Sequence, residues 1–485
     1  MSTVQWEYEV VERPFCQQLV AMGWQWIEGD PDLPETTERS SSRQVLLRAR
    51  LASAIRRITL RDGQPWLDDA RIAQAISDLE QAAGHRLMDV NQEATRLLLK
   101  GTVVDGLPEW EQGRPQPVRY IDWERTDNND FLVISQYKVE LSSGRGYVIP
   151  DAMCFVNGIP LVVAELKSPA IENPLSEAIN QLLRYSNQRR EVWPAQYHYD
   201  EGAERLFHTN QLLIASDFFE ARLGTVGAPP EAYLEWADTS PVALGTVAEE
   251  LGIIACAPET HEAAIALAAV GPEQTGRAGT PLFFREPEKR PEGLRGAAGA
   301  HLSSQQVLVA GALRPAHLLD IIRSFTTFQQ VDGKTRKVVA RYQQFRAVHR
   351  AVSRLQEGRT KRRGADRDER GGIIWHTQGS GKSLSMVFLV RKMRTMECLK
   401  RYKVVAVTDR TDLEDQLRET TSLSGEAVRP TDQERSSRES PTALTQRILG
   451  EPTPDIVFAM LQKYQDPGRV VHLPTEQSGR VPVRM

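Results

Sequence analysis

The most distinct hydrophobic pattern in the chain is a pair of short apolar runs, residues 153–156 and 161–166, which flank Asn157-Gly158. Asn-Gly between runs of β-forming residues is a strong hairpin signal, because both residues tolerate the positive φ that a two-residue turn requires. The pattern therefore predicts an apolar β-hairpin in the middle of the chain.

Other elements are predicted around this hairpin. Residues 10–110 are mostly of amphipathic helical pattern, and residues 174–190 are expected to form a helix with Pro174 in its first turn. Apolar runs at 130–139 and 210–217 predict one strand before the hairpin and a buried strand after it. Together these elements predict a mixed sheet flanked by helices.

A second block of alternating elements follows residues 271–300, which are rich in Gly, Pro and Arg and are expected to be a linker. A short apolar strand at 373–375 precedes a glycine-rich turn and a helical pattern at 384–393. Further apolar runs at 404–407 and 456–464 predict buried strands. Strands that alternate with helices are typical of a parallel α/β domain.

The composition is that of a globular protein with more than one domain, since the chain has 485 residues, of which 40% are hydrophobic and 26% charged. No apolar run approaches the roughly 20 residues that cross a bilayer, so no membrane partner is expected. The N-terminus lacks the basic and apolar regions of a secretion signal. Because the four cysteines are scattered without metal-ligand spacing, a reduced, cytoplasmic protein is expected.

The net charge of −4 does not by itself indicate nucleic-acid binding, but the charge is unevenly distributed. Residues 334–370 contain 13 Lys and Arg against 4 Asp and Glu. Such a stretch could follow a phosphate backbone, or it could be a solvated basic helix and linker. The sequence leaves both possibilities open.

Charged residues interrupt the apolar hairpin, with Asp151 at its entry and Glu165 and Lys167 at its exit. Glu165 and Lys167 are two positions apart, so both point to one face of the strand. Two carboxylates can hold a hard divalent cation, which can lower the pKa of a bound water and polarise a phosphoryl oxygen. A simple two-residue turn would pair Asp151 with Ala164 and place it on the wrong face, so a bulge, or a bend at Pro150, is expected. The alternative is an edge hairpin with a surface ion pair.

The Pro-Asp at 150–151 and the Glu-Leu-Lys at 165–167 resemble the motif of the PD-(D/E)xK nucleases. The resemblance implies that Asp151 and Glu165 bind Mg²⁺ and that Lys167 completes the catalytic site. Because so short a motif also occurs by chance, the segment that follows it decides how much weight it carries.

Gln181 and Tyr185 lie four residues apart and therefore share one face of the helix expected at 174–190. This segment is similar to the RecB-like branch of the same nucleases, which has a QxxxY motif on the helix after the catalytic strand. The resemblance implies that Gln181 and Tyr185 lie beside the active centre and contact the substrate.

The glycine-rich turn at 376–383 lies between a strand and a helix, where backbone N–H groups can wrap a phosphate at the helix N-terminus. The turn, with His376 in place of the usual first glycine, resembles the P-loops of superfamily 2 helicases and of the R subunits of type I restriction enzymes. The resemblance implies an ATP site in which Lys382 reaches the β- and γ-phosphates and Ser383 holds Mg²⁺. The residues expected to bind ATP in this turn are Thr377, Gln378, Gly379, Ser380, Gly381, Lys382 and Ser383.

Two neighbouring segments resemble the same R subunits. Residues 341–348 are similar to their adenine-reading segment, with Gln344 as the matching glutamine. Residues 408–416 are similar to their motif Ia, which lies near the nucleic-acid strand. The motifs therefore occur in the order found in R subunits.

The resemblance implies an α/β fold with a PD-(D/E)xK nuclease domain at 1–260, a linker at 261–303 and a first RecA-like motor domain at 304–485. This motor domain is expected to be incomplete and not to turn over ATP, because no acidic DEAH-like box occurs before residue 485. The implied function is Mg²⁺-dependent cleavage of double-stranded DNA together with methyltransferase (M) and specificity (S) subunits, with ATP-driven translocation in the full-length enzyme.

Two alternatives stay open. One is a non-catalytic fragment that binds DNA or the M and S subunits, and a cleavage assay with Mg²⁺ would separate it from a nuclease. The other is a free-standing ATP-dependent repair nuclease, which would need no M subunit as a partner.

Overall fold

The computed structural model divides the chain into two compact units, Met1–Arg323 and Ser324–Met485, each of which is described by itself. Each unit combines helices and strands, as the sequence predicts. The structure describes residues 7–110, 113–194, 196–198, 200–252, 302–331, 333–360, 368–375, 377, 381–408, 428–436, 440–460 and 483–484.

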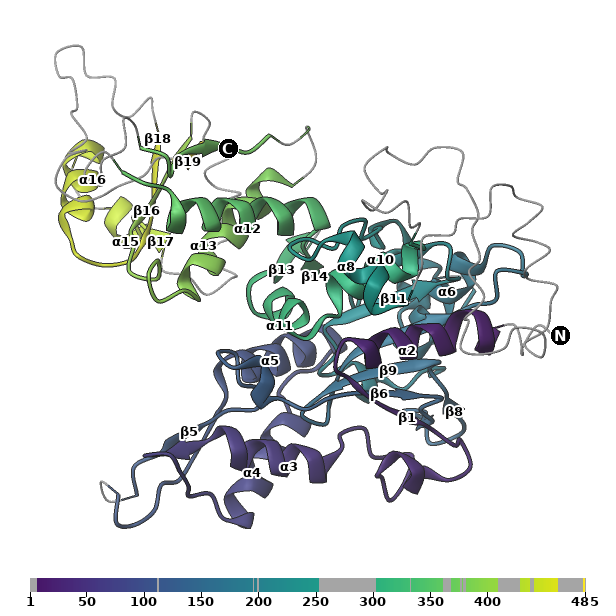
Figure 1. Ribbon diagram of the computed structural model, residues 1–485. Coiled ribbons are helices and arrows are strands. Elements are labelled where there is room, and N and C mark those ends of the chain that lie inside the picture. Colours follow the sequence, from purple (N-terminus) through teal and green to yellow (C-terminus); the bar gives the residue numbers. More distant parts are fainter. Residues whose placement is uncertain are drawn as a thin grey trace. The chain divides into compact units, whose positions relative to one another are not determined.

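The core of the first unit is a six-stranded mixed sheet with the strand order β1-β6-β9-β10-β11-β12 (Figure 1). Parallel pairing joins β1 to β6 and β10 to β11, whereas the other neighbours are antiparallel. All residues of β6, β9, β10 and β11 are buried, as expected for strands covered on both faces. The bounds are β1 (Gln25–Glu28), β6 (Phe131–Ser135), β9 (Ala152–Val156), β10 (Ile159–Leu166), β11 (Leu212–Ser216) and β12 (Ala221–Gly224).

Helices cover both faces of this sheet. The apolar side of α6 (Pro174–Tyr185) packs in one cluster with Met153 and Phe155 of β9, with Val163 of β10 and with alternate residues of β6 and β11. The residue between the first two, Cys154, points to the opposite face. It lies near Cys16 of α2 (Arg13–Ala21), which packs on β1 and β6. The central strands are therefore enclosed between α6 and α2.

The first unit extends past the domain boundary at 260 that the sequence pattern suggests. α10 (Ser304–Ala312) packs on α2 and β12, and it is continued by α11 (Pro315–Ser324). All but one of the residues of α10 are buried, because its sequence is apolar around most of the helix and must be covered on several sides. The first unit thus includes residues 304–323, which the resemblance to R subunits had placed in the motor domain.

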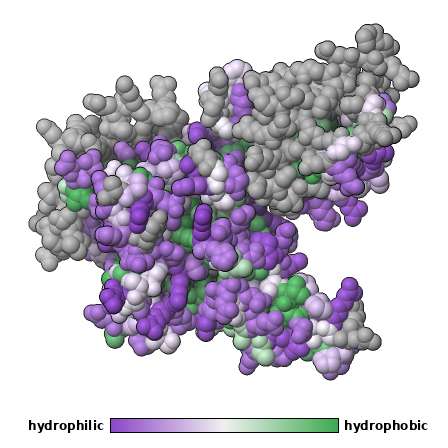
Figure 2. Space-filling view, turned by 180° about the vertical axis from the view of Figure 1, so that it is seen from behind, coloured by the Kyte–Doolittle hydropathy of each residue, from purple (hydrophilic) through white to green (hydrophobic). Residues whose placement is uncertain are grey.

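The chain between β1 and β6 contributes the predicted helices, α3 (Arg48–Ile58), α4 (Asp69–Glu80) and α5 (Leu87–Lys100). It also contributes two short ribbons, β2–β3 and β4–β5, at 60–65 and 102–118. The face drawn in Figure 2 is mostly hydrophilic where the chain is described, with green apolar areas between the polar ones. No helix in the described ranges is both long and apolar enough to cross a membrane.

The second unit contains a parallel sheet in the order β16-β18-β17, as expected for a RecA-like domain. A hairpin of β13 (Thr326–Val331) and β14 (Lys334–Val339) comes first along the chain. Helices α12 and α13 pack against each other. The bounds are α12 (Tyr342–Glu357), α13 (Lys382–Arg394), β16 (Val404–Thr408), β17 (Val428–Arg429) and β18 (Ile456–Met460), and β15 (Gly372–Ile373) pairs with β19 (Val483–Arg484).

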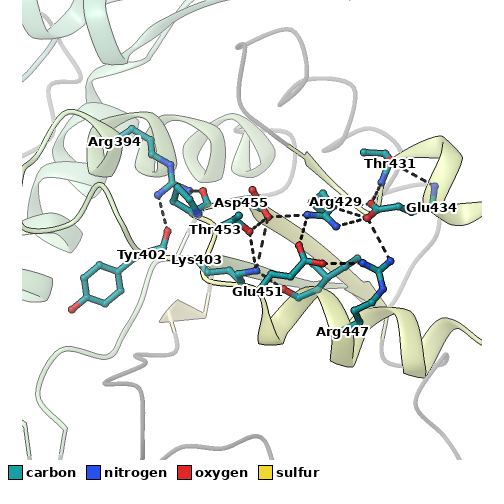
Figure 3. Close-up of polar contacts among 12 residues, drawn as sticks. Arg394, Tyr402, Lys403, Arg429, Thr431, Glu434, Arg447, Glu451, Thr453 and Asp455 are labelled. Atoms are coloured by element: carbon teal, nitrogen blue, oxygen red, sulfur yellow. Dashed lines mark hydrogen bonds and ion pairs between the residues drawn. The ribbon is translucent and has the colours of Figure 1, made fainter.

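A network of charged side chains ties β17 to the segment that leads into β18 (Figure 3). Arg429 donates to Glu434 at 2.8 Å, to Glu451 at 2.9 Å and to Asp455 at 3.2 Å. Arg447 of α16 (Pro441–Gly450) donates to Glu451 at 2.9 Å. One guanidinium therefore links three acidic groups from two segments of the second unit, Glu434 in the segment after β17 and Glu451 and Asp455 in the segment before β18.

Basic residues in the stretch 334–370 are partly used within the unit. Lys337 is buried with its ammonium over the ring of Phe328, and Arg359 and Arg370 form ion pairs with acidic neighbours at 368–369. Three of the basic groups in this stretch therefore take part in contacts within the unit.

Candidate active site

The turn of the central hairpin is built as predicted. Asn157 and Gly158 have φ angles of 54° and 78°. The Asn157 side chain is buried, accepts from the backbone N–H of Asp130 at 2.8 Å and donates to the carbonyl of Tyr120 at 2.9 Å. A Cβ on Gly158 would lie 2.5 Å from the carbonyl oxygen of Leu47. The turn is therefore fixed by its surroundings as well as by its own residues.

The expected register problem is corrected by a bulge inside β10. The pairing of β10 with β9 shifts by one residue at Leu161. Beyond the shift Ala152 lies opposite Ala164, so that Asp151 comes level with Glu165. Because one residue of slip exchanges the two faces of a strand, the bulge brings both carboxyl groups to the same face.

Three charged groups meet at this end of the sheet. The Nζ of Lys167 lies 2.6 Å from Oε1 of Glu165 and 3.6 Å from Oδ2 of Asp151. The same Oδ2 accepts from the backbone N–H of Leu166 at 2.7 Å. The exposed fractions of Asp151, Glu165 and Lys167 are 7%, 0% and 8%. β10 is a central strand and the charges are buried, which excludes the alternative of a surface ion pair on an edge hairpin.

The electrostatics of the cluster are those of two buried acids with one base. Burial and the nearby Asp151 raise the pKa of Glu165 well above its ordinary value. Burial also raises the pKa of Asp151 to about 6, against the opposing effect of Lys167. Burial alone would lower the pKa of Lys167, but the two acids raise it. With both acids ionised the cluster has an excess negative charge, which favours an additional cation.

The residues present fit a magnesium ion. Oε2 of Glu165 is buried, and among the residues that the structure describes no hydrogen-bond donor contacts it. Among the described residues, no group of three or more His, Cys, Asp or Glu could hold a metal. Mg²⁺ commonly uses one or two carboxylates and keeps several waters as its remaining ligands. The pair Asp151 and Glu165 therefore suits Mg²⁺ better than a metal that requires a cage of protein ligands.

Gln181 and Tyr185 lie together on α6, as the sequence predicts. The amide of Gln181 donates to the hydroxyl of Tyr185, which in turn donates to the carbonyl of Ile149 at 3.2 Å. The Tyr185 side chain is buried, and its pKa is raised by that burial and by the charge of Glu165. Its hydroxyl therefore holds the segment that leads into Asp151, and the substrate contact expected for this pair stays a prediction.

Two further acids near the cluster were not found from the sequence. The carboxyl of Glu12 is buried and accepts from the amide of Gln136 at 3.0 Å. Burial and the charge of Asp151 raise the pKa of Glu12 to about 8. Glu7 accepts from the backbone N–H of Ser168 at 2.9 Å. No motif connects these N-terminal residues with the hairpin, since they reach it only through the packing of an N-terminal helix.

The second predicted site is partly described. The amide of Gln344 donates to the carbonyl of Gly381 at 2.9 Å, so the expected adenine-reading residue contacts the end of the glycine-rich turn. Lys382 begins α13 and is exposed, Ser383 is half-buried, and Thr377 is exposed. The positions 376, 378–380 and 409–416, which carry the rest of the predicted P-loop and most of motif Ia, lie outside the described residues.

Comparison with known proteins agrees with the two-part architecture. Residues 5–232 match the family described as type I restriction enzyme R protein N terminus, and residues 343–481 match the SWI2/SNF2 ATPase family. The chain is 30% identical over 459 residues to the type I restriction enzyme HindI endonuclease subunit of Haemophilus influenzae, which covers 94% of this chain and 36% of that protein. It is 24% identical over 474 residues to the putative type I restriction enzyme MjaIXP endonuclease subunit of Methanocaldococcus jannaschii, with 96% of this chain and 38% of the relative covered. The chain thus spans little more than a third of the length of these relatives.

Proposed function

Because residues 5–232 of this chain belong to the family of type I restriction enzyme R proteins, we propose that the chain supplies the nuclease site of such an enzyme and cleaves double-stranded DNA with Mg²⁺. The observation that carries the proposal is the convergence of Asp151, Glu165 and Lys167 in one buried cluster.

In this proposal Asp151 and Glu165 hold Mg²⁺ through their carboxylate oxygens. The bound ion would lower the pKa of a water and stabilise the charge that develops on the phosphate. Lys167 keeps its proton at Nζ, because the two acids raise its pKa, and it donates hydrogen bonds to the attacking water or to a phosphate oxygen. The water oxygen bonds to phosphorus as one P–O bond to a deoxyribose breaks, a proton of that water passes to solvent, and the leaving oxygen takes a proton from another water.

The neighbouring groups orient these reacting residues. The hydroxyl of Tyr185 fixes the chain at Ile149, two residues before Asp151, and Gln181 orients that hydroxyl. Gln181 is only half-buried, so it is the member of the pair that can also face a DNA strand. Glu12 adds a further acid, whose pKa is raised by the charge of Asp151 as well as by burial.

The second unit is proposed to bind ATP with Mg²⁺, using Gln344 with Lys382 and Ser383 at the start of α13. Support comes from the SWI2/SNF2 match and from the contact between Gln344 and Gly381. In the complete enzyme, ATP would drive translocation along DNA, and M and S subunits would be the partners that select the sequence.

The test is cleavage of plasmid DNA by the chain with Mg²⁺, with and without M and S subunits. Glu165→Ala and Lys167→Ala are expected to abolish cleavage, whereas Glu93→Gln, at an exposed ion pair on α5, is expected to leave it unchanged. Retained cleavage in either active-site variant would refute the assigned roles. DNA binding by the wild-type chain without any cleavage would support the non-catalytic alternative, and cleavage that needs no M subunit would support the free-standing nuclease.

A further inference from the structure

The helix α10 lies outside both segments that match known families. Those matches cover residues 5–232 and 343–481, whereas α10 spans Ser304–Ala312. Nevertheless α10 is buried in the first unit and packs directly on α2 and β12. The helix is therefore part of the nuclease unit, although neither match assigns it a role.

Gln305 on this helix forms a buried bridge between two other elements. Gln305 is buried, with only 1% of its surface exposed. Nε2 donates to the carbonyl of Val11 at 3.0 Å, and Oε1 accepts from the hydroxyl of Ser216 at 2.8 Å. Both ends of the amide are thus used, and a buried amide with both ends bonded fixes the separation of its partners.

Each partner of Gln305 is adjacent to a residue of the candidate active site. Val11 directly precedes Glu12, whose carboxyl lies close enough to Asp151 for the charge of Asp151 to raise its pKa. The carbonyl of Ser216 accepts from the backbone N–H of Lys167 at 2.8 Å. The bridge therefore connects the segment that carries Glu12 with the strand end that holds Lys167.

Other contacts hold α10 in the position that the bridge requires. Gln18 of α2 donates to the carbonyl of Gln306 at 2.8 Å, and Trp24 donates to the carbonyl of Leu313 at 3.1 Å. The hydroxyl of Ser304 accepts from a backbone N–H of β12 at 3.2 Å. Because these bonds remain when Gln305 is replaced, a change in its side chain tests the bridge separately from the docking of the helix.

We propose that Gln305 is a positioning residue of the nuclease site, which keeps the Glu12 segment and the Lys167 strand end at the spacing that metal binding needs. The inference rests on the proposed nuclease function. Without the amide, the carbonyl of Val11 loses a buried hydrogen bond and the hydroxyl of Ser216 retains the carbonyl of Glu220, at 3.0 Å, as its acceptor. The two elements can then shift relative to each other. Along the chain, α10 is followed by α11, which leads to the second unit at Ser324.

The experiment compares two variants of the full chain, Gln305→Met and Ser303→Ala. Methionine has a similar length but forms neither hydrogen bond. Ser303→Ala removes the N-cap of the same helix, whose hydroxyl accepts from the backbone N–H of Gln306 at 3.2 Å, and leaves the bridge intact. Each change is expected to lower the unfolding midpoint. Three quantities are measured for each protein: the unfolding midpoint, the Mg²⁺ concentration that gives half-maximal cleavage, and the Mg²⁺-induced rise of the midpoint.

Gln305→Met is expected to raise the half-maximal Mg²⁺ concentration several-fold, less than the roughly tenfold that follows loss of a direct partner of a metal ligand, because Gln305 contacts neighbours of the site and not Asp151 or Glu165. Ser303→Ala is expected to leave it unchanged. If both variants lose stability and neither shifts the Mg²⁺ dependence, Gln305 only helps α10 to pack and the inference is wrong. If Gln305→Met folds poorly, Ser216→Ala, at the other end of the bridge, must show the same Mg²⁺ shift. Wild-type protein with neither cleavage nor Mg²⁺-induced stabilisation would instead overturn the proposed function itself.

Discussion

Replacing Glu165 with glutamine is expected to make the metal-free protein more stable and, at the same time, to remove its response to Mg²⁺. In the wild type, Glu165 and Asp151 are buried beside a single ammonium group. Glutamine has nearly the same shape as glutamate, and it removes one of the two negative charges. The substitution therefore relieves a repulsion that, on the proposed function, exists only to bind a cation.

The pH dependence of the metal-free wild type follows from the pKa of Asp151, which burial raises from 3.8 to about 6. A shift of about 2 units corresponds to about 3 kcal/mol. Between these two pH values the folded protein holds a proton that the unfolded chain has lost, so the free energy of unfolding falls as the pH rises. Glu12, whose pKa rises from 4.5 to about 8, extends the same trend towards neutral pH. Metal-free wild-type protein should thus lose stability from about pH 4 to about pH 8.

The assay is calorimetric unfolding of the full chain with chelator or with Mg²⁺, and hydrogen exchange of β9 and β10 identifies the transition of the first unit. The pH-dependent loss of about 3 kcal/mol that the Asp151 shift implies for the wild type corresponds to roughly 5–10 °C. Glu165→Gln should raise the metal-free midpoint near pH 8 and lose the Mg²⁺-induced rise, whereas Glu93→Gln should change neither. The reasoning is refuted if metal-free Glu165→Gln is less stable than the wild type, or if wild-type stability is independent of pH across this range.

Three further predictions concern other parts of the chain. Gly158→Ala should destabilise the first unit by more than about 2 kcal/mol in urea unfolding, because it combines a φ of 78° with a 2.5 Å approach to a backbone carbonyl; Gly63→Ala, at a φ of 76° with open space around it, should show only the smaller backbone strain. Tyr185→Phe removes the hydroxyl bonded to Ile149 and should lower the cleavage rate at saturating DNA while leaving the KM for DNA unchanged; a raised KM alone would indicate direct substrate contact instead. Arg429→Met leaves three acidic partners without their shared cation. Hydrogen exchange should therefore become faster in β17 and α16 and stay unchanged in the first unit. Unaltered exchange in the second unit would show that the network does not stabilise that unit.

The sequence predicts the features that depend on neighbours in the chain. The Asn157-Gly158 turn, the helix that presents Gln181 and Tyr185, and the parallel strands of the second unit all follow from spacing and local conformational preference. Glu12 and Gln305 follow from neither, because they reach the active site through packing between helices that lie far apart in the chain. The same holds for α10, because the unit to which this helix belongs depends on the surfaces that cover it.

The register of β10 is an intermediate case, since the sequence contains a signal for it that the hairpin pattern alone does not use. Pro160 has no N–H to donate, and a proline inside a central strand is typical of a bulge. The bulge follows at the next residue, Leu161, whose carbonyl turns towards β11 and accepts from the backbone N–H of Gln211 at 2.7 Å. The carbonyl of Pro160 accepts from the hydroxyl of Thr209 at 3.0 Å, so the irregular segment leaves neither carbonyl without a partner. An irregularity four residues before Glu165 is thus stabilised by the neighbouring strand, and it is the reason that the two acids lie on one face and can share a cation.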